Sequence, residues 1–173
     1  MKVWMSPHEI KKIRKYLTRN TVMLEYGSGG STLFFSKYVK EYYSIEHNKD
    51  WYSKVKKKTA NRNIKTFLSI NKAVPKPRVI AKCWNDLEKS SRYNSFKEYI
   101  KYPKKIGKKF DAVLIDGRAR PECAKFIYDY LNKGAYVFIH DYWNRPHYHV
   151  VEEKYQVIDH IKQGQSLVVL RKK

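Results

Sequence analysis

The stretch that decides the fold is TVMLEYGSGGST, residues 21–32. Its first six residues form a short apolar run typical of a buried β-strand, and glycines from Gly27 onward stop that run abruptly. Apolar residues then recur at helical spacing over 33–38. The stretch therefore predicts a strand, a glycine loop and a helix in succession. Gly27 and Gly29 let the backbone come close to a ligand and direct helix N-terminal amides at it, which suits a nucleotide-like cofactor.

The rest of the chain repeats this alternation of strand and helix. Apolar runs predict further strands at 42–46, 64–70, 110–116 and 135–139, and amphipathic patterns predict helices at 7–17, 50–59 and 121–131, the last closed by residues 132–134. Two final strands, 155–161 and 166–170, are joined as a hairpin. The pattern predicts an α/β fold with a mostly parallel seven-stranded sheet, a C-terminal antiparallel hairpin and helices on both faces.

The length of 173 residues predicts one domain over 1–173. Residues 71–108 lose clear periodicity and gather Pro75, Pro77, Pro103 and Gly107. We expect an insertion or lid there, with aromatic residues between 96 and 102 packing down as a helix.

The charge is strongly positive: 37 Lys and Arg against 16 Asp and Glu give a net charge of +21. Such a balance attracts anionic partners, which include nucleic acid, acidic glycan and anionic lipid. The excess is equally consistent with a composition rich in Lys, Asn, Ile and Tyr, in which surface lysines are simply solvated.

Other global features point to a reducing compartment. Cys83 and Cys123 are too few for a disulfide framework and lack metal-ligand spacing. Residues 1–12 lack the apolar run of a signal peptide, and no stretch approaches the ~18 apolar residues of a membrane span. We therefore expect a cytoplasmic protein, and the sequence leaves its oligomeric state open.

Glu46 ends the strand that follows the glycine loop. Rossmann-type sites place an acid at this position to accept hydrogen bonds from both ribose hydroxyls of a cofactor. Residues 25–32 resemble the first motif of S-adenosylmethionine-dependent methyltransferases, with Glu46 matching the ribose-binding acid of that family. Dehydrogenases differ, because their motif ends in glycine where Thr32 stands here. The resemblance implies an S-adenosylmethionine cofactor contacted by Glu25, Gly27, Ser28, Gly29, Ser31, Glu46 and Asp116.

Later segments narrow the resemblance. Residues 115–118, 139–142 and 145–148 are similar to a smaller group of sugar O-methyltransferases, some of them from large DNA viruses. This similarity implies methylation of a sugar or glycan hydroxyl. It also implies a substrate pocket above the ends of the strands that finish near Asp116 and His140.

Methylation of an alcohol needs a base. His140 is the first candidate because its ordinary pKa of ~6.5 suits proton abstraction near neutral pH, with Asp116 or Asp141 as orienting group or alternative base. The same three residues could ligate a divalent metal. We do not favour the metal, because the metal-dependent O-methyltransferases that this chain resembles carry Asp-Asn after the fifth strand, where it has His140-Asp141 or Asp141-Tyr142.

The acceptor is expected to be a small molecule or glycan that contacts Arg118, Tyr142, Arg145 and His147. Basic side chains near the site, Arg118, Arg120, Lys125 and Arg145, could hold a carboxylate or phosphate on an anionic acceptor, although several are expected there by chance in so basic a chain. Two alternatives stay open. The basic surface could hold RNA for methylation, although no motif for base or ribose methylation is present. The chain could also be a non-enzymatic basic binding module that has kept only the fold.

Overall fold

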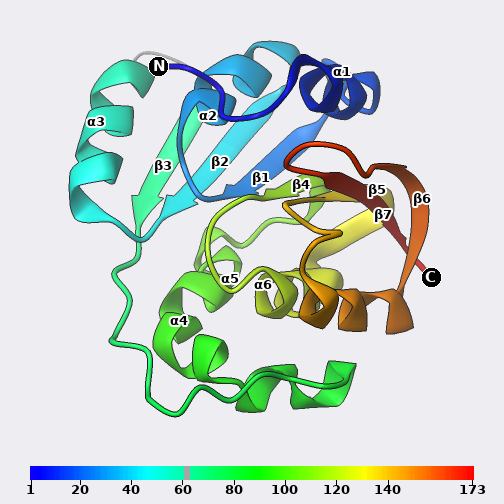
Figure 1. Cartoon of the computed structure of the whole chain (residues 1–173). Helices are drawn as coiled ribbons and strands as arrows, with labels where there is room; N and C mark the ends of the chain where they lie inside the picture. The colour runs from blue at the N-terminus through cyan, green and yellow to red at the C-terminus, as the bar shows by residue number, and fades with distance from the viewer. Residues whose placement is uncertain (61–62) are drawn as a thin grey trace.

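The computed structural model describes residues 1–60 and 63–173 and contains one seven-stranded sheet of order β3-β2-β1-β4-β5-β7-β6 (Figure 1). β1 to β5 are parallel, and β7 runs antiparallel to both β5 and β6. The fold prediction is thus confirmed. The strands are β1 (Val22–Tyr26), β2 (Glu41–Glu46), β3 (Ile64–Leu68), β4 (Phe110–Ile115), β5 (Leu131–His140), β6 (Tyr155–Ile161) and β7 (Leu167–Lys172).

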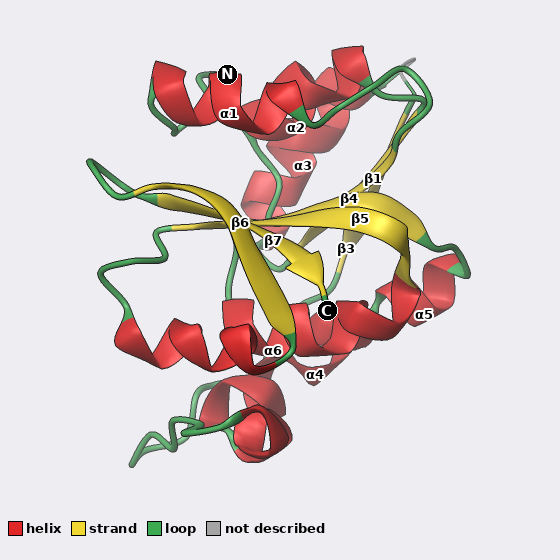
Figure 2. Cartoon of the chain, turned by 90° about the vertical axis from the view of Figure 1, so that its right-hand side faces the viewer, coloured by secondary structure: helices red, strands yellow, loops and turns green. Residues whose placement is uncertain are grey.

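Helices cover both faces of this sheet, with α1 to α3 on one side and α4 to α6 on the other (Figure 2). Each face has its own cluster of buried apolar side chains. Within 1–60 and 63–173, no helix has the length and apolar character needed to cross a bilayer. The helices are α1 (Pro7–Lys15), α2 (Gly30–Phe35), α3 (Lys49–Thr59), α4 (Ser91–Lys101), α5 (Pro103–Ile106) and α6 (Arg120–Ile127), with short 3₁₀ segments η1 (Ser36–Tyr38), η2 (Trp84–Lys89), η3 (Tyr128–Tyr130) and η4 (Pro146–Glu153).

Helix α1 begins where the sequence predicts. Ser6 caps it by accepting a hydrogen bond from the Glu9 amide, and the Glu9 carboxylate accepts one from the Ser6 amide, so that two otherwise unpaired amides are satisfied. The helix ends at Lys15, two residues before the predicted Leu17. Ile13 on its inner side is fully buried, which fixes the helix against the sheet.

Residues 71–108 are more regular than the sequence predicts. The expected helix over part of 96–102 is confirmed by α4, whose Tyr99 and Ile100 are fully buried. Because α4 lies between β3 and β4 in the chain and packs on the sheet, it is the crossover that parallel strands require. The structure therefore corrects the expectation of irregular backbone over 84–106. The part that stays irregular, the remaining candidate for a lid, belongs to the stretch 69–83 before η2.

The start of β5 is a second correction. The sequence predicts that residues 132–134 close a helix, but they belong to the strand, which begins at Leu131. The register between β4 and β5 shifts after the Phe110 to Leu131 pair, and Gly134 takes a positive φ of 78° at this irregularity. Gly134, which the sequence pattern assigns to a helix end, therefore lies in an irregularity of the strand.

Candidate active site

A cavity of about 1000 Å³ lies at the carboxyl ends of β1, β2, β4 and β5. This is the edge where open α/β sheets place their ligands. The glycine loop 27–31 and the residues that follow β2 form one side of its lining, and residues 116–122 with residues that follow β5 form the other. The irregular stretch 69–83 adds Val74 and residues 78–80.

Gly27 is required by the close approach of two strand ends. Its φ of +95° lies in a region that side chains disfavour, and a Cβ built on it would lie 2.9 Å from the backbone of Gly117. The two glycines bring the loops after β1 and β4 into contact. This contact forms the floor of the cavity between its two sides.

Gly29 has a different reason to be glycine. Its backbone is extended, and a Cβ there would make only ordinary contacts, the nearest at 3.9 Å to Ser31 Oγ and Trp51 Nε1. The residue lines the cavity, so its missing side chain leaves space on the ligand side of the loop. This is the space that a cofactor held against the loop would need.

Glu25 lies behind the glycine loop and does not reach the cavity lining. It is fully buried, and its carboxyl oxygens accept hydrogen bonds from the hydroxyl groups of Ser31 and Thr32. Burial raises the pKa of Glu25 to about 8 even though these hydroxyls act against the shift. Glu25 was expected to contact the cofactor directly, but in the structure it supports the glycine loop from outside the cavity lining. Ser28 and Ser31, also expected at the cofactor, do line the cavity.

Glu46 lines the cavity at the end of β2 and organises two loops. Its Oε1 accepts from the amides of His47 and Asn48, each at 2.9 Å, and its Oε2 accepts from the Ser28 amide at 2.8 Å. Burial alone would raise the pKa of Glu46, but hydrogen bonds from His47 and from the Ser28 and Asn48 amides lower it below its ordinary value. A carboxylate oxygen accepts about two hydrogen bonds, so Oε2 has room for one more donor.

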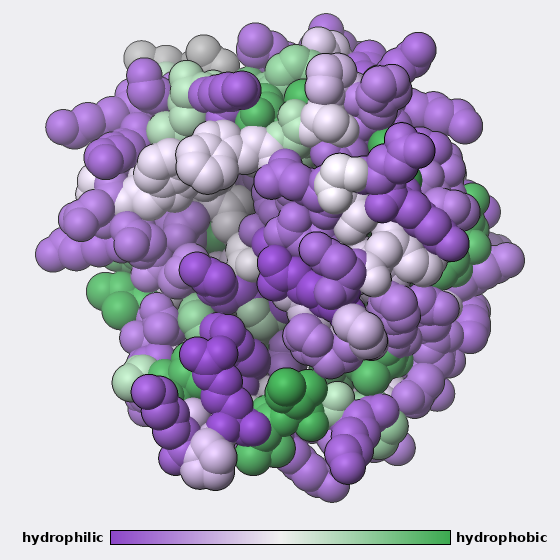
Figure 3. Space-filling model, viewed as in Figure 1, coloured by the Kyte–Doolittle hydropathy of each residue, from purple (hydrophilic) through white to green (hydrophobic). Residues whose placement is uncertain are grey.

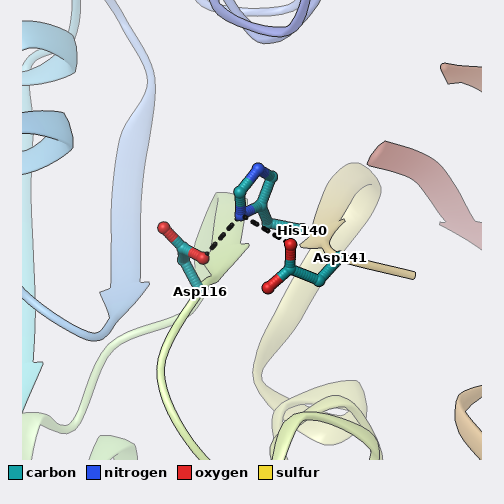
Figure 4. Close-up of side chains that lie close together, drawn as sticks. All are labelled: Asp116, His140 and Asp141. Carbon is teal, nitrogen blue, oxygen red and sulfur yellow. Dashed lines mark hydrogen bonds and ion pairs between the residues drawn. The ribbon is translucent and has the colours of Figure 1, made fainter. Parts of the chain in front are cut away.

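Asp116, His140 and Asp141 come together at the ends of β4 and β5 (Figure 4). His140 Nδ1 lies 2.9 Å from Asp116 Oδ1 and 3.8 Å from Asp141 Oδ1. The side chains of Asp116 and Asp141 are 23% and 21% exposed, but that of His140 is only 3% exposed. The sequence prediction that these three residues share a site agrees with this geometry.

Glu9 also reaches this cluster, although the sequence suggests only a capping role for it. One carboxyl oxygen holds the Ser6 amide at 2.7 Å, and the other faces His140 Nε2 at 3.4 Å. Burial alone would lower the pKa of His140, but the hydrogen bond to Asp116 and the charges of Asp116, Asp141 and Glu9 raise it. With a carboxylate at each ring nitrogen, the protonated imidazole is favoured. Nδ1 is held by Asp116, and Nε2 is buried against Glu9 without a hydrogen bond to any described residue.

Arg120 is the cation that both aspartates already face. Its buried guanidinium places Nη2 3.1 Å from Asp141 Oδ2 and 3.5 Å from Asp116 Oδ1, and it also donates to the backbone carbonyls of His140 and Gly117. The ligand atoms of Asp116, His140 and Asp141 lie within 4.8 Å of one another. A divalent ion among them would meet the positive charge of Arg120, so this arrangement fits an ion-pair cluster and does not fit a metal site.

The residues expected at the acceptor divide into two groups. Arg118, Arg145 and His147 line the cavity, and Arg145 also faces Asp141 at 3.4 Å. Tyr142 does not line it: the ring is fully buried, and the hydroxyl donates to Glu152 at 2.8 Å. The structure therefore does not bring Tyr142 to the cavity with the other residues expected at the acceptor. The sequence pattern missed lining residues from distant segments, including Lys2, Trp4, Trp51, Arg78 and Arg92.

No protein-family model matches this chain, and no curated protein is significantly similar to it in sequence. Solved structures do share its fold. A methyltransferase-like protein from Silicibacter pomeroyi has 23% sequence identity and a TM-score of 0.69, over 99% of this chain and 88% of that one. A Streptococcus mutans protein described as a methyltransferase, solved in complex with SAH (S-adenosylhomocysteine), has 14% identity and a TM-score of 0.61 over 99% and 100% of the two chains.

An rRNA methylase from Streptococcus thermophilus has 14% identity and a TM-score of 0.59, over 99% of each chain. All three likenesses span nearly the whole of this chain. The chain therefore has the Rossmann-like fold of methyltransferases.

Proposed function

We propose that this protein is an S-adenosylmethionine-dependent O-methyltransferase that methylates a hydroxyl of a sugar or glycan. The observation that carries the proposal is one cavity in which the glycine loop and the Glu46 carboxylate lie on one side and two accessible carboxylates, Asp116 and Asp141, lie on the other. The methyltransferase fold of its structural neighbours supports the same cofactor.

The residues on the β1 and β2 side fit this cofactor. Gly29 leaves space beside the loop, and Glu46 Oε2 can accept a further hydrogen bond from a ribose hydroxyl without losing the Ser28 amide. Ser28 and Ser31 border the same space. When bound, S-adenosylmethionine supplies a methyl group activated by its sulfonium.

On the other side, we assign proton removal to Asp116. With S-adenosylmethionine bound, which would supply the methyl group to the acceptor oxygen, Asp116 would accept the proton that the acceptor hydroxyl loses. His140 and Arg120 hold the Asp116 side chain, because both lie against its Oδ1. We infer that His140 positions the base and does not take the proton itself, since both its ring nitrogens face carboxylates.

The choice of a sugar hydroxyl rests on the resemblance of residues 115–118, 139–142 and 145–148 to sugar O-methyltransferases. RNA methylation is the second candidate, because the net charge is +21 and the S. thermophilus neighbour is an rRNA methylase. Labelled S-adenosylmethionine offered with glycans, nucleotide sugars, RNA and DNA separates the two. Label on RNA alone would replace the sugar proposal.

The cofactor is tested by calorimetry of SAH binding. We expect Glu46→Ala to weaken binding by about 10- to 150-fold, the equivalent of the ~1.5–3 kcal/mol of a charged hydrogen bond. Glu41→Ala is the matched control, since Glu41 begins the same strand, pairs with Lys108 and does not line the cavity. Equal affinities for wild type and Glu46→Ala would remove Glu46 from the cofactor site.

A further inference from the structure

Arginine and lysine are distributed differently over this molecule. The described residues, 1–60 and 63–173, hold 28 lysines and eight arginines. Five of those eight arginines line the cavity, but only two of the 28 lysines do so. Hydrophilic side chains cover the face seen in Figure 3 broadly and do not form a single stripe. Most lysines therefore lie outside the cavity, whereas arginine is concentrated at it.

Two of the five cavity arginines have partners in the protein. Arg120 faces both aspartates, and Arg145 faces Asp141. Three others, Arg78, Arg92 and Arg118, have no side-chain hydrogen bond or ion pair with any residue in the described part of the chain. They come from the irregular stretch 69–83, the first turn of α4 and the loop after β4. Three distant segments thus bring unpaired guanidinium groups to one cavity.

These three charges act on one another and on the acceptor side. Burial, followed by the charges of Arg78 and Arg118, lowers the pKa of Arg92. Burial, followed by the charges of Arg145 and Arg92, lowers the pKa of His147, which lies in η4 after β5. Arg118 follows β4, and His147, on which Arg92 acts, follows β5, so this group of charges includes the β4 and β5 half of the cavity.

The acid that acts on Arg92, Glu122, does not neutralise it. Glu122 influences Arg92 electrostatically but forms no ion pair with it, and its Oε1 accepts a hydrogen bond from Ser90. Burial raises the pKa of Glu122, which weakens it further as a counter-ion. Like charges held together at a cavity wall are costly unless a bound anion compensates them.

We propose that the methyl acceptor is a sugar that carries a phosphate ester or diphosphate, and that Arg78, Arg92 and Arg118 bind the phosphate. This inference rests on the proposed function for the transferred methyl group. Guanidinium groups pair with phosphate oxygens through two parallel hydrogen bonds, which lysine cannot do. The phosphate undergoes no chemistry: it fixes the sugar so that one hydroxyl meets Asp116.

A small phosphorylated acceptor fits better than RNA. A polymer that binds through its backbone uses a basic groove that extends along the protein surface. Here 26 of the 28 lysines lie outside the cavity, whereas the three unpaired arginines lie within one cavity of about 1000 Å³. The arrangement suits a compact anion that shares its cavity with the cofactor.

The test measures binding to the protein saturated with SAH, by calorimetry, for glucose 1-phosphate, UDP-glucose, inorganic pyrophosphate and glucose. We expect the phosphate-bearing probes to bind and glucose not to bind. Arg92→Gln combined with Arg118→Gln should weaken their binding at least ~10-fold, and Arg78→Gln alone should weaken it in the same direction. Comparison of glucose 1-phosphate with UDP-glucose separates a monoester from a diphosphate.

The matched control removes two charges elsewhere: Lys57→Gln with Lys58→Gln, both exposed on α3 and outside the cavity. It should leave probe binding unchanged. Normal SAH binding with no preference for phosphate over glucose would overturn this inference and leave the proposed function standing. Failure of the wild type to bind SAH would overturn the proposed function itself. One further outcome would replace the inference by a surface RNA site. In that outcome the phosphate probes do not bind, a short RNA does bind, and the double lysine substitution weakens RNA binding as much as the double arginine substitution does.

Discussion

The two halves of the cavity are built from different kinds of group. The half at β1 and β2 relies on backbone amides and on carboxyl groups that the amides or hydroxyls already satisfy, as around Glu25 and Glu46. The half at β4 and β5 relies on charged side chains, with Arg120 and His140 between carboxylates. Backbone amides bind a constant ligand without depending on particular side chains, whereas charged side chains can be substituted one at a time. The difference suits a fixed cofactor beside a variable acceptor.

The charged half should give the largest effect on chemistry. We expect Asp116→Asn to lower turnover by the ~100- to 10,000-fold typical of a lost general base, at saturating cofactor and with the acceptor that the labelling panel identifies. His140→Asn should lower turnover less, because it removes only a positioning contact. Asp129→Asn, a control at an exposed position in η3, should leave turnover unchanged. A greater loss from His140→Asn than from Asp116→Asn would restore His140 as the base.

The backbone half is best tested with its two glycines. Gly27→Ala should lower the free energy of unfolding by about 2–5 kcal/mol, because positive φ and the contact with Gly117 add strain and overpacking. Gly29→Ala should stay within about 1 kcal/mol of wild type in urea unfolding, since its Cβ would make only ordinary van der Waals contacts, and yet weaken SAH binding, because Gly29 lines the cavity. Equal destabilisation by both changes would contradict the separate roles of the two glycines.

Glu25 gives the backbone half a signature in its pH dependence. The folded-state pKa of about 8 exceeds the ordinary value of 4.5, so the native state holds the proton more tightly than the unfolded chain does. The associated stability is fully present below about pH 4.5 and is lost as the pH rises to about 8, by an amount on the order of a few kcal/mol. Urea unfolding at both ends of this range should show the decline in wild type and a smaller one in Glu25→Gln. Identical pH profiles would show that Glu25 is ionised in the fold.

The smallest effect is expected from metal removal. Because the Arg120 guanidinium faces both Asp116 and Asp141, turnover should be unchanged by a chelator. Assays with and without EDTA, with added magnesium or manganese as the reverse test, measure this directly. Activity that disappears with EDTA and returns with a divalent ion would place a metal where the geometry places Arg120.

Much of the backbone half could be predicted from the sequence, because strand, loop and helix follow one another within residues 21–38 and local patterns determine them. Asp116 and Asp141 were predictable for a similar reason, since parallel strands end at one edge of the sheet. The contact between Glu9 and His140 could not be predicted, because no periodicity links the first helix to the fifth strand. The convergence of Arg78, Arg92 and Arg118 also depends on how loops pack, and the strand that begins at Leu131 depends on a bulge.

The position of β7 has a consequence for synthesis of the chain. β7 lies between β5 and β6 in the sheet, but it leaves the ribosome after both. Until residues 167–172 emerge, the edge of β5 is unpaired and β6 has no partner strand. Open strand edges recruit other chains, so a newly made chain is most prone to aggregation before β7 has paired with β5 and β6. Temperature during that final step should therefore influence how much protein is recovered, even though residues 167–172 lie at the far side of the sheet from the glycine loop.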